Sequence, residues 1–490
     1  MKYILTIDAG TTSVRAILYD VKKNQFVKIE KQPFTQIFPK PAWVEHNAEE
    51  IWEKVKDCIL TVCKNINPKD IYGLGITNQR ETVVAWDSKT LKPLSNAIVW
   101  QCRRTSKFCE KLKKSKIGKL IHNKTGLIPD AYFSATKIKW LLDNDKNVKE
   151  ALKNKTLKVG TIESFLVYKL SHGKSFVTDI TNASRTMLFN IKTLCWDEDL
   201  LKFFNIPKEI LPEVVDNDTV VGFTNILGQE VKIAGLIGDQ QSSLFGQGCF
   251  EEGMAKNTYG TGCFMLVNTS NKPIKSKHGL LTTIGYKQKG KLTYALEGSV
   301  FNAGSVVNWA IDNLGIASTY EEITNLAYQV DSSDGVYLVP AFTGLGTPYW
   351  DMNARAIIVG LTRASDKRHI SRAVLESMAF SSYDVLKTMQ RDTKLKIKEL
   401  HVDGGASENE KLMQFQCDLL QTNLKKYNQE STCLGVIFMT GLATGVFKDI
   451  NEIKGLLKSI KDYKPQKEEK EIQFNLKYWH GAVKKCLRKI

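Results

Sequence analysis

The chain has 490 residues, a length that favours two or more large domains over one. Its hydrophobic fraction of 42% is sufficient for sizeable cores. The sequence contains no run of about 18 apolar residues, the length that a membrane-spanning helix needs. The formal net charge of +17 is mostly lysine, spread along the chain without motifs typical of nucleic-acid binding. We therefore expect a solvated basic surface and no nucleic-acid or membrane partner, with a nucleic-acid binder as the alternative that charge alone would suggest. Ten scattered cysteines without CxxC pairs favour reduced thiols.

Short β-branched runs alternate with amphipathic stretches in the first half of the chain. Residues 3–10 and 16–20 are predicted to form two strands joined by a tight glycine-threonine turn. Asn47 is suited to cap a helix over 48–64, because the apolar residues there recur at helical spacing. Two further apolar runs are predicted to be buried strands: residues 71–76 and 96–100.

The second half of the chain repeats part of this pattern. A boundary is predicted near 248–253, which divides the chain into residues 1–248 and 249–490. Just beyond it, residues 257–266 read as a second strand, glycine turn and strand. Two related lobes, one in each half, are therefore expected.

Three more segments complete the predicted elements. Ser371 is predicted to open a helix, and residues 399–405 are predicted to form a strand that ends in a glycine turn. The charged segment 461–473 is predicted to be a solvated connection before a final helix. Alternation of this kind favours an α/β fold with sheets covered by helices.

Three glycine turns could bind a nucleotide. Residues 8–13 offer backbone N–H groups and hydroxyls to phosphate, and Asp8 at the strand end could help to hold Mg²⁺. Residues 259–262 offer the same groups, and the strand end at 402–406, followed by Asn409, could seat an adenosine. Each turn alone is also consistent with a structural hairpin, which is the favoured interpretation for 259–262.

A fourth group of residues could bind hydroxyl groups. Arg80 and Glu81 follow an apolar strand, where they could form an exposed ion pair or bind a hydroxylated ligand. Trp100 is expected in the core when it is considered alone. Asp239 follows the apolar run 233–238, where a buried carboxylate is costly unless it is paired or catalytic. From spacing alone, a structural role for Asp239 is favoured over a catalytic one.

Taken together and in this order, the motifs resemble the FGGY family of carbohydrate kinases over nearly the whole chain. The resemblance is carried by IDAGTTSVRA, GITNQRET, NAIVWQCRRT, GDQQSSLFGQ, AKNTYGTGCF and VDGGASENEKLMQF. GITNQRET followed by NAIVWQCRRT resembles the members that phosphorylate glycerol. The resemblance implies two actin-like, ribonuclease H-like lobes around a central cleft, a transferase that uses ATP and Mg²⁺, and glycerol as the acceptor.

The resemblance also implies roles for individual residues. Asp239 would be the general base, Arg15 would contact the γ-phosphate, and Asp8 would help to hold Mg²⁺. Residues implied to bind the acceptor are Arg80, Glu81, Trp100, Tyr132, Asp239, Gln240 and Phe264. Residues implied to bind the nucleotide are Gly10, Thr11, Thr12, Ser13, Thr261, Gly262, Gly304, Asn308, Gly405, Ala406 and Asn409. A cytoplasmic homo-oligomer, either a dimer or a tetramer, is expected by the same resemblance.

Two alternative functions stay open. The same chemistry could act on another small polyol or sugar, or the chain could be an actin-like or Hsp70-like nucleotide-dependent switch. The segment 225–235 is shorter than in family members inhibited by a sugar bisphosphate, and it lacks their arginine. That regulation is therefore not expected here.

Overall fold

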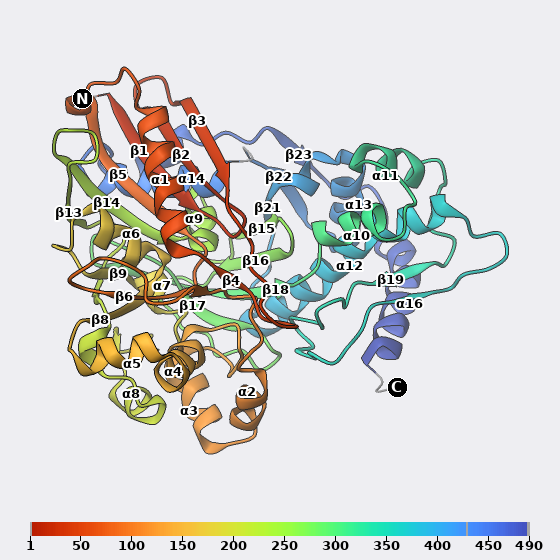
Figure 1. Cartoon of the computed structure of the whole chain (residues 1–490). Helices are drawn as coiled ribbons and strands as arrows, with labels where there is room; N and C mark the ends of the chain where they lie inside the picture. The colour runs from red at the N-terminus through yellow and green to blue at the C-terminus, as the bar shows by residue number, and fades with distance from the viewer. Residues whose placement is uncertain (1, 428–429, 488–490) are drawn as a thin grey trace.

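The computed structural model describes residues 2–427 and 430–487, and Figure 1 shows their arrangement. Two mixed sheets with helices packed around them confirm the predicted α/β class. Among the described residues, no helix has the length and apolar character that a membrane crossing requires. The predicted lobes, 1–248 and 249–490, include a few residues that the structure does not describe: 1, 428–429 and 488–490.

The first sheet has six strands in the order β13-β14-β5-β1-β2-β3. The strands are β1 (Tyr3–Ala9), β2 (Ser13–Asp20), β3 (Gln25–Pro33), β5 (Ile71–Asn78), β13 (Val220–Thr224) and β14 (Val231–Gly238). β1 and β2 form the predicted antiparallel hairpin, while β1, β5 and β14 run parallel. Because the carboxyl ends of these three strands meet at one edge, Asp8, Arg80 and Asp239 are brought to the same side of the sheet.

The second sheet has seven strands in the order β17-β18-β16-β15-β21-β22-β23. The strands are β15 (Ala255–Tyr259), β16 (Cys263–Asn268), β17 (Leu281–Gln288), β18 (Lys291–Val300), β21 (Glu399–Gly404), β22 (Asn423–Lys426) and β23 (Lys461–Tyr463). β15 pairs antiparallel with β16 and parallel with β21. This repeats the arrangement of β1, β2 and β5, and it confirms the second strand-turn-strand unit.

Smaller sheets and the helices complete the fold. A four-stranded sheet contains β4 (Glu45–His46), β7 (Ala97–Ile98), β6 (Val83–Asp87) and β8 (Leu157–Thr161). Three strand pairs are β9 (Val177–Asp179) with β12 (Glu213–Val215), β10 (Phe189–Asn190) with β11 (Cys195–Trp196), and β19 (Tyr337–Val339) with β20 (Ile357–Val359). The helices are α1 (Ala48–Val62), α2 (Ser106–Lys113), α3 (Lys116–Thr125), α4 (Ser134–Asn144), α5 (Lys146–Lys153), α6 (Ile162–Leu170), α7 (Ile180–Ala183), α8 (Glu198–Phe204), α9 (Asp239–Gly246), α10 (Gly304–Asp312), α11 (Tyr320–Ala327), α12 (Lys367–Thr393), α13 (Glu410–Leu420), α14 (Ser431–Ala443), α15 (Ile450–Leu456) and α16 (Glu469–Leu487). Short 3-10 turns cover Pro68–Asp70, Lys208–Ile210 and Gly405–Glu408.

Local capping explains where two helices begin. Asn47 caps α1 as predicted, since its side chain accepts from the backbone N–H groups of the first turn. The predicted start of α12 at Ser371 is wrong, because the helix begins one turn earlier, at Lys367. Asp366 accepts from the backbone N–H of Arg368 at 2.9 Å, and His369 reaches back to the N–H of Asp366. This capping box fixes the start of the helix ahead of its apolar face.

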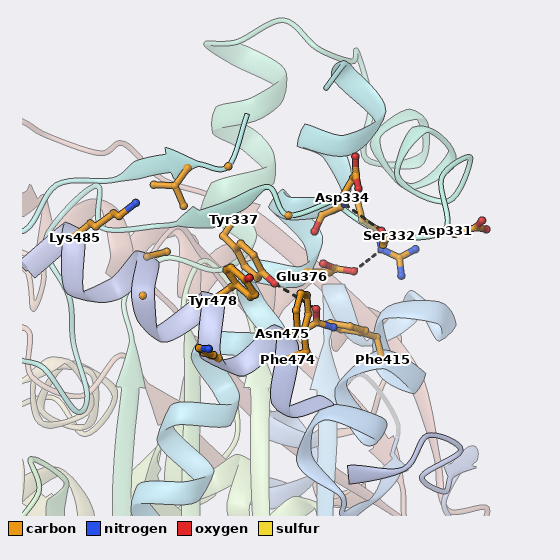
Figure 2. A pocket seen from close by; sticks show the side chains of 18 of the residues that line it. Asp331, Ser332, Asp334, Tyr337, Glu376, Phe415, Phe474, Asn475, Tyr478 and Lys485 are labelled. Atoms are coloured by element: carbon orange, nitrogen blue, oxygen red, sulfur yellow. Dashed lines mark hydrogen bonds and ion pairs between the residues drawn. The ribbon is translucent and has the colours of Figure 1, made fainter. Parts of the chain in front are cut away.

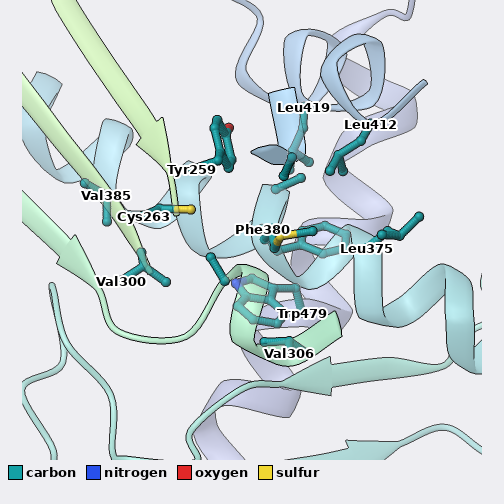
Figure 3. Close-up of a cluster of buried hydrophobic side chains, with 14 of the residues drawn as sticks. Tyr259, Cys263, Val300, Val306, Leu375, Phe380, Val385, Leu412, Leu419 and Trp479 are labelled. Carbon is teal, nitrogen blue, oxygen red and sulfur yellow. The ribbon is translucent and has the colours of Figure 1, made fainter. Parts of the chain in front are cut away.

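The predicted solvated connection at 461–473 is wrong at both ends. Residues 461–463 form β23, which pairs antiparallel with β22 at the edge of the second sheet. α16 begins at Glu469, which leaves a connection of only a few residues. The predicted final helix is confirmed, and its Trp479 stacks on Phe380 of α12 with ring centroids 5.2 Å apart (Figure 3).

Hydrophobic cores join parts of the chain that are far apart in sequence. α14 lies against β1, β5 and β14 of the first sheet, although it follows the second sheet in the chain (Figure 1). Its Val436 and Ile437 share a buried cluster with Ile4 and Tyr19. Likewise, Tyr294 of β18 belongs to a cluster formed mostly by residues before position 212. Residues from the two halves of the chain therefore share hydrophobic cores.

All ten cysteines are free, in agreement with the expected reduced thiols. Nine of them are buried, and Cys195 on β11 is exposed.

Candidate active site

Asp239 lies at the carboxyl end of β14 and is the first residue of α9. One carboxylate oxygen, Oδ1, accepts from the backbone N–H of Gln240 at 2.7 Å and lies 3.3 Å from Nε of Arg80. The side chain is 25% exposed, so one side remains open. Burial raises the pKa of Asp239 to about 6, although the guanidinium of Arg80 opposes the shift. Such a carboxylate is ionised at neutral pH and can still accept a proton.

Arg80 is buried, and its guanidinium contacts several site residues at once. Nη1 donates to Glu297 and to Oε1 of Gln241 at 3.2 Å. Nη2 donates to the hydroxyl of Tyr132 at 3.0 Å and to Oε1 of Glu297 at 3.1 Å. Since Nε faces Asp239, the structure brings together three predicted acceptor residues: Arg80, Tyr132 and Asp239.

Arg185 and Glu297 complete this cluster, although the sequence does not single them out. Nε of Arg185 donates to Oε1 of Glu81 at 2.7 Å, and its Nη2 donates to Oε1 of Glu297 at 2.8 Å. Both side chains are fully buried. Glu297 interrupts the apolar run of β18, which is a signal that could have revealed it. Arg185 lies in a polar turn and carries no such signal.

Three aromatic side chains form a wall beside the charged cluster. The ring of Trp100 meets Tyr132 at 5.5 Å and Phe264 at 6.1 Å between centroids, both edge to face. Nε1 of Trp100 donates to the hydroxyl of Thr11 at 3.0 Å. Trp100 thus touches the first glycine hairpin and a strand of the second, so the two hairpins lie near the same site.

The first glycine turn is closed by backbone contacts. The N–H of Gly10 donates to the carbonyl of Ser13 at 3.1 Å, and Nε2 of Gln79 donates to the carbonyl of Gly10 at 2.9 Å. Asp8 and Arg15 face each other across β1 and β2 and form an ion pair. Arg15 also pairs with Glu430, and the nearby Asp8 carboxylate raises its pKa above the usual range. Arg15 is therefore held by two carboxylates, and its contact with phosphate stays a prediction.

The second glycine turn packs against the start of α10. The carbonyl of Thr261 accepts from the N–H groups of Ala303 at 2.8 Å and Ser305 at 3.2 Å, while the N–H of Gly304 donates to Gly260 at 3.0 Å. A side chain at Gly262 would place its Cβ 2.4 Å from the carbonyl oxygen of Val300, so only glycine fits without a shift. The structure thus brings Gly304 to the turn at 259–262.

A cavity of about 850 Å³ lies between α11 and the start of α13. It is lined by Tyr320, Thr324, Tyr328 and Asn409, among others. Asn409 caps α13 by accepting from the N–H of Leu412 at 3.0 Å. Of the predicted adenosine residues, Asn409 lines this cavity, whereas the remaining four do not: Gly304, Asn308, Gly405 and Ala406.

A buried lysine, not singled out by the sequence, lies behind the predicted base. Nζ of Lys256 donates to Oε1 of Gln240 at 2.6 Å and to the hydroxyl of Thr258 at 2.9 Å. Burial lowers the pKa of Lys256 to about 8, while the buried carboxylate of Asp403 opposes the shift. Lys256 thus links α9, which carries Asp239, to β15 of the second sheet.

A second cavity, of about 730 Å³, is shown with its lining side chains in Figure 2. It is bounded by α16 and the loop at 331–335, and Tyr337, Tyr478 and Lys485 are among its lining residues. No predicted site residue lines it.

Comparison with known proteins agrees with this arrangement. The FGGY family of carbohydrate kinases matches residues 3–246 with its N-terminal domain and residues 255–444 with its C-terminal domain. A glycerol kinase from Francisella philomiragia is 50% identical over 493 residues, which cover 99% of each chain. The structure of Plasmodium falciparum glycerol kinase with ADP has a TM-score of 0.91 and 35% identity, covering 100% of this chain and 99% of that one. Ligand-bound xylulose kinase from Lactobacillus acidophilus has a TM-score of 0.88 and 26% identity, covering 99% and 97%.

The fold is that of the FGGY carbohydrate kinases, which confirms the predicted actin-like lobes. The chain belongs to the FGGY family. Within that family it is similar over its full length to glycerol kinases.

Proposed function

We propose that the chain transfers the γ-phosphoryl group of ATP to glycerol and forms sn-glycerol 3-phosphate. The observation that carries this proposal is the convergence of Asp239 with Arg80 and Tyr132 beside the ring of Trp100. The 50% sequence identity to a glycerol kinase over 99% of the chain also supports it.

The mixture of polar groups and rings suits a small triol. Hydroxyl groups need both donors and acceptors, which Arg80, Glu81 and Asp239 would supply. The carbon chain needs an apolar wall, which Trp100 and Phe264 would supply. A site built to pair each hydroxyl disfavours acceptors that leave its buried polar groups unpaired. Gln240 would add a donor, because Lys256 occupies its Oε1 and leaves the amide N–H groups for the acceptor.

The proposed reaction needs one proton acceptor. As the 3-hydroxyl oxygen of glycerol attacks the γ-phosphorus, its proton passes to the carboxylate of Asp239. The bond from the γ-phosphorus to the bridging oxygen breaks, and ADP leaves with that oxygen. Positioning and charge neutralisation account for most of the catalysis in such transfers.

We propose that both glycine turns bind the triphosphate. The first would use Gly10, Thr11, Thr12 and Ser13, and the second would use Thr261 and Gly262. Gly304, Asn308, Gly405, Ala406 and Asn409 would bind the adenosine. The cavity beside Asn409 supports a nucleoside site at that end of the second sheet. Arg15 would leave its carboxylate partners for the γ-phosphate.

Mg²⁺ fits the residues present at the first turn. Both contacts from Arg15 use Oδ2 of Asp8, so Oδ1 can accept from a metal-bound water. No cluster of three metal-ligating side chains occurs in the described residues, which suits an ion held by one carboxylate and by phosphate oxygens. The bound ion would neutralise charge on the phosphates.

We also propose the lobes 1–248 and 249–490, a homo-oligomer and a cytoplasmic location. Free, mostly buried cysteines fit a reducing compartment. Val27 and Ile29 on the edge strand β3 and Leu60 on α1 are exposed and apolar, which supports contact with a second copy. Sedimentation would decide between a dimer and a tetramer.

Product identification tests the proposed reaction. Purified protein is incubated with ATP, Mg²⁺ and glycerol, and phosphorus NMR is expected to show glycerol 3-phosphate and ADP in equal amounts. A parallel panel of tetritols and pentuloses should give slower turnover. Faster turnover on a pentulose would favour the other-acceptor alternative. ATP hydrolysis that glycerol leaves unchanged, without phosphorylated product, would favour the nucleotide switch.

A further inference from the structure

Four buried side chains of alternating charge form a closed ring at the acceptor site. Arg80 binds both oxygens of Glu297, and Glu297 accepts from Arg185 at 2.8 Å. Arg185 donates to Glu81 at 2.7 Å, and Glu81 closes the ring 3.6 Å from Nε of Arg80. We call Arg80, Glu81, Arg185 and Glu297 the charge ring.

The ring is built from separate parts of the chain and is almost free of solvent. Arg80 and Glu81 follow β5, Arg185 follows α7, and Glu297 comes from β18 of the second sheet. Each side chain is at most 2% exposed. Buried charges are tolerated only when each has its partner, and two arginines with two carboxylates sum to zero. Removing one member therefore leaves an uncompensated charge beside the site.

Two ring members, Arg80 and Glu81, are among the residues proposed to bind glycerol. Arg80 lies 3.3 Å from the carboxylate of Asp239, and Glu81 is next to it in the chain. Arg185 and Glu297 are not in contact with Asp239 but hold these two by directional hydrogen bonds. Their place is thus behind the acceptor-binding pair.

We infer that Arg185 and Glu297 are positioning residues, which orient Arg80 and Glu81 toward glycerol and balance the charge around the proton acceptor Asp239. This inference rests on the proposed function, since it requires Asp239 to accept the proton of glycerol. Other charged groups that face Asp239 are Asp8 on β1 and Lys256 on β15, and neither is changed by the experiment below.

Opposite charge changes should give opposite pH effects. Glu297→Gln leaves the ring with one extra positive charge, which favours ionised Asp239. The acidic limb of the pH profile, where kcat/KM falls as Asp239 is protonated, should therefore move to lower pH. Arg185→Met leaves an extra negative charge and should move that limb to higher pH. A unit charge about 8 Å away at an effective dielectric constant of about 20 gives a displacement of about 1.5 pH units in each direction. The double variant R185M/E297Q makes the ring neutral again, so the acidic limb of its pH profile should coincide with that of the wild-type protein.

The measurement is kcat/KM for glycerol from pH 5 to 9 at saturating ATP and Mg²⁺. KM for ATP should stay within about twofold, because the ring does not line the nucleotide cavity. Glu198→Gln, which changes one exposed carboxylate on α8, is the matched control and should leave the limb in place. The inference would be overturned if the acidic limbs of both single variants moved in the same direction, or if neither moved, while the wild-type protein still phosphorylated glycerol. No glycerol turnover by the unchanged chain would reject the proposed function instead.

A variant that keeps the charge separates geometry from electrostatics. Arg185→Lys retains the positive charge but cannot span Glu81 and Glu297 with one planar group. We expect its acidic limb to stay in place while KM for glycerol rises at least fivefold. If a single-charge variant does not accumulate as folded protein, this variant and the double variant carry the comparison. An unchanged KM for glycerol in Arg185→Lys would overturn the positioning role.

Discussion

Asp239 is partly buried, and its side chain is still 25% exposed toward the site. Burial disfavours the charged form, whereas Arg80 favours it, and burial prevails to bring the pKa to about 6. A base with this pKa is ionised at pH 7 and is stronger than an ordinary aspartate. This balance suits removal of a proton from an alcohol.

Asp239→Asn should lower kcat by roughly 10²–10⁴, because the amide cannot accept the proton. Binding of ATP should remain, since the nucleotide residues are on other elements. A coupled assay measures turnover, and fluorescence of a labelled ATP measures binding. Near-normal turnover would remove Asp239 from the mechanism.

The pH dependence of glycerol turnover follows from the same group. Below pH 6 Asp239 is protonated, so kcat/KM should fall about tenfold for each pH unit, and it should level off above pH 7. The profile is measured at saturating ATP and Mg²⁺ with glycerol varied. A limb near pH 4, the range of an ordinary carboxylate, would contradict the raised pKa.

Stability should change in the opposite sense to activity. The pKa of Asp239 is higher in the folded protein than in the unfolded chain, so the folded state binds the proton more tightly. The resulting contribution to the free energy of unfolding is present in full below pH 4 and is lost as pH rises through 6. Asp239→Asn stays neutral and should keep that contribution, which makes it more stable by ~1–3 kcal/mol at pH 8. Denaturation by urea at pH 8 measures this difference. Equal or lower stability at pH 8 would show that Arg80 depends on the ionised form.

At the scale of elements, α14 supports the helix that begins with Asp239. α9 and α14 cross so closely that a Cβ at Gly435 would lie 1.9 Å from the carbonyl oxygen of Ser242. A Cβ at Gly246 would lie 1.9 Å from the carbonyl oxygen of Ser431. Glycine at these positions thus allows backbone contact between the two helices, and α9 is held firmly against the first sheet.

Gly435→Ala should force α9 and α14 apart. We expect a loss of about 1–3 kcal/mol in stability, as for other overpacked sites, together with lower kcat because Asp239 begins α9. Thermal unfolding and the coupled assay measure the two effects. Gly455→Ala on α15 is the matched control, since its Cβ meets nothing within 4 Å and alanine favours the helix. Equal behaviour of the two variants would contradict the role of the crossing.

Local sequence patterns predict the elements better than they predict the contacts between them. The hairpins, the cap of α1 and the final helix follow from spacing and from neighbouring residues. β23 could not be predicted, because a short charged segment becomes a strand only by pairing with β22, some 37 residues away. The sequence also places the start of α12 one turn late, since the capping role of Asp366 is not part of the apolar pattern.

The candidate site divides in the same way. Arg80, Trp100 and Asp239 stand out from the sequence because they lie at strand ends in motifs that resemble a family. Glu297 pairs with Arg80, 217 residues away, and Arg185 pairs with Glu81, 104 residues away. A local sequence pattern cannot predict such distant pairs. Lys256 looks like an ordinary surface lysine in the sequence, yet the fold buries it beside Asp403.

At the scale of the whole molecule, shared cores tie the two halves together. α14 covers the first sheet, and Tyr294 of β18 donates to the carbonyl of Ile191 at 2.7 Å. A fragment of residues 1–248 would expose Ile4 and Tyr19, which α14 covers in the full chain. The halves should therefore depend on each other for stability.

Residues 1–248 expressed alone should aggregate or unfold at a lower temperature than the full chain. The physical reason is the apolar surface left by the missing α14. Solubility and circular dichroism measure the outcome, and co-expression with residues 249–490 is the control that should restore folding. A soluble fragment with full-length stability would show that the halves fold independently.

Cys195 is the one exposed cysteine among ten, and the other nine are buried. A maleimide dye should therefore attach once per native molecule, at β11, without prior removal of other thiols. β11 carries none of the proposed glycerol and nucleotide residues, so the label should leave turnover intact. The chain already carries a single attachment point for following its motions by fluorescence.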